Sequence, residues 1–181
     1  MSRIGKLPIN IPAWVEVNIN WQTVAVKWPK WQLQYTAPAG VILNKTENVV
    51  DVNIQSEEYK NLWGLVRTLI NNMVVGVTQW YEKKLHVLWV WYNVKLQWNK
   101  LVLNLWYSHP INYELPTGVS AAVEKDSKWN DIITLNSIDK EMLGQTAAKI
   151  ITFRPPEVYK WKGIRYFWQV IKLKAGKTAK K

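Results

Sequence analysis

The sequence predicts an α+β protein made of two tandem, duplicated domains, each of small antiparallel β-sheets packed with one α-helix, followed by a basic C-terminal tail. Three observations lead to this prediction. Most of the chain alternates apolar and polar residues as strands do, two stretches instead repeat apolar residues at helical spacing, and the pattern recurs after about 78 residues. The 181 residues are enough for two small domains.

Two hairpins are predicted from the alternation. The apolar residues of the first are Val15, Val17, Ile19, Val24 and Val26. Those of the second are Val94, Leu96, Leu101, Leu103 and Leu105. Trp21-Gln22 joins the strands of the first hairpin, and Trp98-Asn99 joins those of the second.

Two helices are predicted from spacings of three and four residues. The apolar residues of the first are Tyr59, Leu62, Val66, Leu69, Ile70 and Met73. Ser56 precedes this helix, and Glu57 and Glu58 lie in its first turn, where carboxylates interact favourably with the positive end of the helix dipole. The second helix carries Met142, Leu143, Thr146, Ala147, Ile150 and Ile151 on one face. Ser137 or Asp139 can cap it.

The two halves of the chain match in order. The pairs are Trp21 with Trp98, Pro38 with Pro116, Gly40 with Gly118, and Gly64 with Gly144. Residues 33–35 likewise overlie residues 111–113, and both precede a Pro-x-Gly turn. We therefore expect an N-terminal repeat at 1–81, a C-terminal repeat at 82–153 and a basic extension at 154–181.

Composition excludes several classes of protein. With 48% hydrophobic and 20% charged residues, the chain is typical of folded globular proteins. The absence of cysteine excludes disulfide scaffolds and thiolate zinc sites, and two histidines are too few for a histidine metal cluster. We expect no metal, no cofactor and no small-molecule substrate. The longest apolar run, residues 87–92, falls far short of the roughly 20 residues of a membrane helix, so a soluble, cytoplasmic protein is expected.

The net charge of +11 is concentrated at the C-terminus. Residues 154–181 hold nine of the 24 Lys and Arg residues but one of the 13 Asp and Glu residues. Two prolines begin this segment, and aromatic residues alternate with its cations. Lysines attract phosphates with release of counterions, and aromatic or Arg planes stack on unpaired bases. A solvated lysine tail without a partner is the alternative, but this combination favours RNA binding.

An enzyme is not expected. Ser108 and His109 are neighbours on an extended chain, so their side chains point to opposite sides. Phosphate-binding glycine motifs and the His-Glu-x-x-His zinc motif are absent, and the carboxylates are scattered.

The 13 tryptophans raise a second alternative, a carbohydrate-binding module whose indoles stack on sugars. They are scattered among turns and both strand faces, which argues against a single sugar-binding platform.

Six strings of residues resemble a known family, bacterial ribosomal large-subunit protein six. They are Met-Ser-Arg-Ile-Gly-Lys at 1–6, Leu-Ile-Asn-Asn-Met-Val-Val-Gly-Val at 69–77, Glu-Lys-Lys-Leu at 82–85, Tyr-Ser-His-Pro at 107–110, Arg-Pro-Pro-Glu at 154–157 and Lys-Gly-Ile-Arg-Tyr at 162–166. The resemblance runs in register from end to end. It implies two domains of similar fold, in agreement with the repeat.

The resemblance also implies a function. It indicates a structural ribosomal component that binds large-subunit ribosomal RNA, contacts neighbouring large-subunit proteins near the stalk base and the factor-binding region, and supports assembly and translation. The family's basic motif falls on residues 155–166. The expected RNA-binding residues are therefore Arg154, Tyr159, Lys160, Lys162, Gly163, Arg165, Tyr166, Lys172, Lys174, Lys177, Lys180 and Lys181.

Departures from the resemblance concentrate in tryptophan. Eleven positions carry Trp where the family pattern has glycine: Trp14, Trp21, Trp28, Trp31, Trp80, Trp89, Trp91, Trp98, Trp106, Trp161 and Trp168. Trp63 is different, because Trp-Gly-Leu is a family string, and Trp129 does not align clearly. One hypothesis explains the excess: the codon UGA is read as tryptophan in some genetic codes and as glycine in others, so the natural residue at the eleven positions is glycine. The alternative is a lineage that accepts Trp there.

Overall fold

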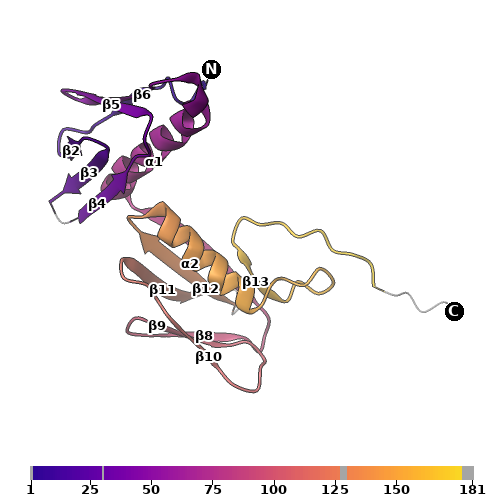
Figure 1. Ribbon diagram of the computed structural model, residues 1–181. Helices are drawn as coiled ribbons and strands as arrows, with labels where there is room; N and C mark the ends of the chain where they lie inside the picture. The colour runs from indigo at the N-terminus through magenta and orange to yellow at the C-terminus, as the bar shows by residue number, and fades with distance from the viewer. Residues whose placement is uncertain (1, 30, 127–129, 177–181) are drawn as a thin grey trace. The chain divides into compact units, whose positions relative to one another are not determined.

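The computed structural model describes residues 2–29, 31–126 and 130–176. The chain divides into two compact units, one ending at Trp80 and the other beginning at Tyr81, with residues 138–140 grouped with the first (Figure 1). Each unit combines antiparallel sheets with one α-helix. This confirms the predicted α+β class.

The first unit has two three-stranded antiparallel sheets. In spatial order, their strands are β2 (Glu16–Asn20), β3 (Thr23–Trp28) and β4 (Trp31–Thr36) in one, and β1 (Ile9–Asn10), β6 (Val49–Ile54) and β5 (Val41–Thr46) in the other. The alternation of the first hairpin places Val17, Val24 and Val26 in the core, where each is at most 1% exposed. Helix α1 (Lys60–Gln79) packs Val66 and Ile70 against the same core.

The start of the first helix differs from the prediction. Ser56 forms no side-chain capping hydrogen bond, and Glu57–Tyr59 is a 3₁₀ turn, η1, that precedes α1. The Tyr59 ring lies beside Gly40, where a Cβ atom would come within 2.5 Å of it. This long-range contact accompanies the tighter first turn, and no local pattern in the sequence reveals it.

The second unit has a three-stranded and a four-stranded antiparallel sheet. In spatial order, their strands are β8 (Asn93–Gln97), β9 (Lys100–Asn104) and β10 (Ile111–Glu114) in one, and β11 (Val119–Lys125), β12 (Asp131–Ser137), β7 (Tyr81–Leu88) and β13 (Gly163–Tyr166) in the other. Helix α2 (Lys140–Phe153) follows β12 directly. Ser137 is the last residue of β12, and its hydroxyl donates to the Gly118 carbonyl, so of the two expected capping residues only Asp139 stands next to the helix.

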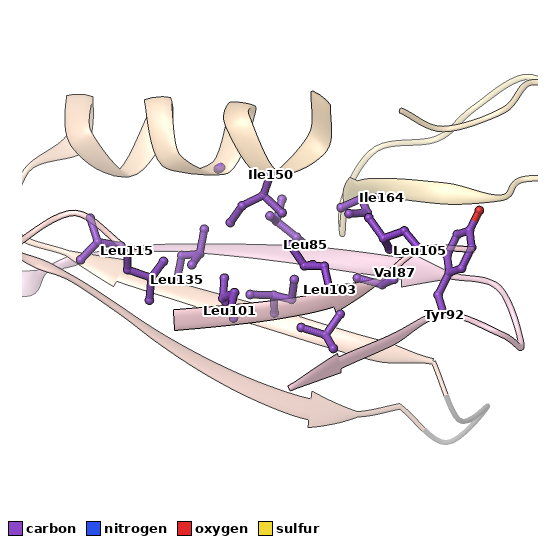
Figure 2. Close-up of a cluster of buried hydrophobic side chains, with 14 of the residues drawn as sticks. Leu85, Val87, Tyr92, Leu101, Leu103, Leu105, Leu115, Leu135, Ile150 and Ile164 are labelled. Atoms are coloured by element: carbon purple, nitrogen blue, oxygen red, sulfur yellow. The ribbon is translucent and has the colours of Figure 1, made fainter. Parts of the chain in front are cut away.

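The core of the second unit lies between its two sheets and beneath α2 (Figure 2). Leu101 and Leu103 come from β9, and Leu85 and Leu135 from the four-stranded sheet. Ile150 points toward that sheet from the helix (Figure 2). Leu143, Thr146 and Ala147 are buried on the same helix, as the spacing predicts.

The two units repeat one plan, which confirms the predicted duplication. The meander β2-β3-β4 corresponds to β8-β9-β10, and the order β1-β6-β5 corresponds to β7-β12-β11. Within the described residues, β13 has no counterpart in the first unit. The sequence did not predict this strand, which belongs to the basic extension.

Candidate nucleic-acid interface

The basic extension folds onto the second unit. After α2 ends, residues 154–162 form a loop closed by two backbone hydrogen bonds, from Ile164 N to Arg154 O at 2.8 Å and from Glu157 N to Lys162 O at 2.7 Å. β13 then runs antiparallel to β7, with Ile164 opposite Val87. Further on, Lys174 N donates to Val158 O at 3.0 Å. The described part of the extension is thus held at several points along its length.

Gly163 and Ile164 attach the extension to the unit. Ile164 is fully buried in the core. Gly163 is also buried and has φ +125°, and a Cβ atom there would lie 2.6 Å from the Pro155 carbonyl oxygen. The close approach of two backbone segments therefore requires glycine at this position. Pro155 and Pro156, the two prolines that begin the extension, form the backbone surface against which Gly163 packs.

The two arginines of the expected site are engaged within the protein. Arg154 Nε donates to the Tyr92 hydroxyl at 3.0 Å, and its guanidinium lies 5.0 Å from the Tyr107 ring centroid. Hydrogen bonding to Tyr107 and Tyr92 raises the pKa of Arg154. Arg165 Nη1 donates to the Gln169 carbonyl at 2.9 Å. We call Arg154, Gly163 and Arg165 the inward group.

Other expected residues face solvent. We call Tyr159, Lys160, Lys172 and Lys174 the outward group, because all four are exposed. The structure places two of them, Tyr159 and Lys160, on the closed loop before β13, and Lys174 where the chain returns to that loop. Lys177, Lys180 and Lys181 lie outside the described residues.

Lys162 and Tyr166 are partly buried and contact indoles. Lys162 Nζ lies 3.7 Å from the centroid of the Trp89 ring, and the Tyr166 ring stacks on Trp168 at 5.5 Å. Lys83 Nζ from β7 lies 5.4 Å from the Tyr166 ring. This lysine was not among the expected site residues, since only the pairing of β13 with β7 brings it beside the extension.

His86 is a second titratable residue of β7 that faces the extension. It lies opposite Arg165 in the β7–β13 pairing, and its Nε2 is 3.8 Å from Asp126 Oδ2. Burial lowers the pKa of His86; Asp126 acts in the raising direction and Arg165 in the lowering direction. The imidazole therefore favours the neutral form.

Two other kinds of site find no support in the described residues. No group of three or more His, Cys, Asp or Glu residues in that part of the chain could hold a metal ion. None of the helices described there is long and apolar enough to cross a membrane.

Comparison with known proteins identifies the family. The family described as ribosomal protein L6 matches residues 11–79 and 90–167. A protein of Gloeothece citriformis named large ribosomal subunit protein uL6 is 49% identical, with all of both chains covered. The proteins of that name from Trichodesmium erythraeum and Geotalea daltonii are each 46% identical, again over all of both chains. The chain belongs to the ribosomal protein L6 family.

The first matched segment of the L6 family lies in the first unit, and the second, apart from residues 138–140, lies in the second unit and includes β13. Membership makes the chain a structural ribosomal protein and not an enzyme, as the sequence predicts. It also disfavours the carbohydrate-binding alternative.

Proposed function

We propose that the chain is a component of the large ribosomal subunit in the cytoplasm and that it binds large-subunit ribosomal RNA through the outward group of its basic extension. One observation carries the proposal: exposed cations lie on a segment that β13 attaches to a folded sheet, in a member of a ribosomal protein family. Placement near the stalk base and the factor-binding region, beside neighbouring large-subunit proteins, rests on the family resemblance.

The outward lysines suit phosphate binding for two physical reasons. Lys160, Lys172 and Lys174 are exposed, and none of them forms an ion pair among the described residues. Each can therefore neutralise a phosphate and release counterions. The backbone that carries them is already ordered by hydrogen bonds, so binding loses less conformational entropy than the ordering of a free tail would.

The inward group supports this role indirectly. Arg154 ties the start of the extension to Tyr92, the hydrogen bond from Arg165 to the Gln169 carbonyl fixes the backbone within the extension, and Gly163 allows the close approach to Pro155. In this proposal these three residues position the outward lysines, which contact the phosphates.

Charge substitutions test the proposal better than deletion of residues 154–181, because deletion also removes Ile164 from the core. The test replaces Lys160, Lys172 and Lys174 together by Gln. We expect binding to large-subunit RNA fragments to weaken, and the slope of log affinity against log salt to flatten by about two to three units.

The matched control replaces Lys27, Lys60 and Lys95, three exposed lysines elsewhere, and makes the same change in charge. It should retain most of the affinity and the original salt slope. Equal losses of affinity in both triple variants would show that binding depends only on the net charge of the protein. Unchanged affinity of the variant that lacks Lys160, Lys172 and Lys174 would refute the assigned site.

A further inference from the structure

Among the non-glycine residues that the structure describes, positive φ angles occur at tryptophans alone. In the described ranges, the glycines with positive φ are Gly40, Gly118 and Gly163. All other positive-φ residues there are tryptophans: Trp21, Trp80, Trp89, Trp98, Trp106 and Trp161. Five of these tryptophans have φ between 55° and 60°, and Trp89 has φ 157°. Asn and Asp, which tolerate this region best after glycine, do not occur there in the described chain.

Three of these tryptophans stand at backbone positions that glycine commonly fills. Trp21 and Trp98 are each the first residue of a two-residue hairpin loop, where primed turns favour glycine. Trp80 ends α1 with φ 59° and ψ 158°, a combination that is essentially restricted to glycine. The duplication repeats the observation, because Trp21 and Trp98 hold the same loop position in the two units.

The two indoles of the hairpin loops add little packing in return. Trp98 is 100% exposed and Trp21 is 94% exposed. Trp63 is the contrast: it lies within α1, its Nε1 donates to the Val52 carbonyl at 2.6 Å, and its ring packs so closely on Gly5 that a Cβ there would come within 2.7 Å. Trp63 behaves as a tryptophan that the fold uses, and Trp21 and Trp98 do not.

We propose that the natural protein carries glycine at the left-handed tryptophan positions, because its gene encodes them with UGA and its translation apparatus inserts glycine at that codon. A codon-level cause acts wherever the codon occurs. It therefore extends to the remaining members of the eleven, Trp14, Trp28, Trp31, Trp91 and Trp168, and leaves Trp63 as tryptophan. Trp129 lies outside the described residues.

The substitution changes the proposed RNA-binding site, and this consequence rests on the proposed function. Three indoles contact expected binding residues: Trp89 lies beneath Lys162, Trp161 lies 5.5 Å from the Arg165 guanidinium, and Trp168 stacks on Tyr166. A cation held over the face of a neutral indole ring is less available to bind an anion. With glycine at these positions, Lys162 and the Tyr166 ring join the outward group.

Peptide mass spectrometry of the natural protein, purified from ribosomes of its own organism, tests the assignment. Trypsin releases residues 96–100, which contain position 98, and residues 61–67, which contain position 63. We expect the first peptide to have the mass of Leu-Gln-Gly-Asn-Lys and the second to retain Trp. Tryptophan in both peptides overturns the proposal, as does a gene with TGG at position 98 and the other left-handed sites.

A second experiment compares recombinant chains and does not depend on RNA. Trp98→Gly should raise the ratio of folded to unfolded protein about five- to thirtyfold. Trp63→Gly, the matched control, should lower this ratio. A lower ratio for Trp98→Gly would contradict the assignment. A glycine-containing chain that is more stable but binds no RNA would instead refute the proposed function and leave this inference standing.

Discussion

The two units place very different strands at the same position of the repeated plan. β1 pairs with β6, and β7 pairs with the corresponding strand β12, but β1 pairs over two residues, Ile9 and Asn10, whereas β7 spans eight, Tyr81–Leu88. The short strand offers little backbone to a further partner. The long one has a second edge, and β13 occupies it. The duplicated fold alone therefore does not create the candidate interface; the length of one strand provides the place where the extension binds.

The largest effect on stability is expected when the buried side chain that anchors β13 is shortened. Ile164→Ala leaves a cavity in a fully buried site, so we expect the free energy of unfolding to fall by about 2–5 kcal/mol. Urea denaturation of the full chain measures it. Val170→Ala, at a position 86% exposed, is the control and should be nearly neutral. If the two variants matched, the extension would be only loosely attached to the second unit.

A second test addresses the close approach of the Gly163 backbone to Pro155 at the start of β13. Gly163→Ala combines a positive φ with a Cβ placed 2.6 Å from the Pro155 carbonyl oxygen, and we expect a loss of about 2–4 kcal/mol. Gly118→Ala also has positive φ, at 92°, but its Cβ would meet nothing within 4 Å, so about 1–2 kcal/mol is expected. Urea denaturation compares the two losses. Equal losses would show that backbone strain alone, and not the close approach, makes glycine necessary.

A third test separates the inward group from the outward group. Arg154→Met removes the hydrogen bond to the hydroxyl of the largely buried Tyr92 and should cost about 1–2 kcal/mol in thermal or urea unfolding. Lys160→Met, its exposed control, should change stability by less than about 0.5 kcal/mol while weakening RNA binding. The division into two groups fails if Lys160→Met destabilises the protein as much as Arg154→Met does.

Periodicity predicted most of the fold because it records one-sided burial. Val24 and Val26 in the first hairpin, and Leu101 and Leu103 in the second, are all buried as the alternation requires. β13 escaped prediction because it has only four residues, Gly163–Tyr166, and pairs with a strand far earlier in the chain. A segment that short carries too few alternations to separate a strand from a loop.

The candidate site was predicted as a segment but not as a surface. A charge count locates cations along the chain, yet their direction depends on distant partners. Tyr92, for example, lies far from Arg154 in the sequence, yet its hydroxyl accepts the hydrogen bond that Arg154 Nε donates. Ser56 stands at the start of the 3₁₀ turn, as its place in the sequence suggests, but it forms no side-chain capping hydrogen bond, since a residue type that often caps helices does not ensure capping geometry.

The smallest expected effect concerns pH at the junction of β7 and β13. Burial lowers the pKa of His86 below its ordinary value of 6.5, and Arg165, which faces it across the pairing, acts in the same direction. The unfolded chain therefore binds a proton first as pH falls, so the stability from neutral His86 is complete above pH 6.5 and decreases below it. Unfolding measured between about pH 8 and about pH 5 should show this decrease, and His86→Gln should reduce it. The exposed His109 is the control: if His109→Gln reduces the decrease equally, the junction is not its source.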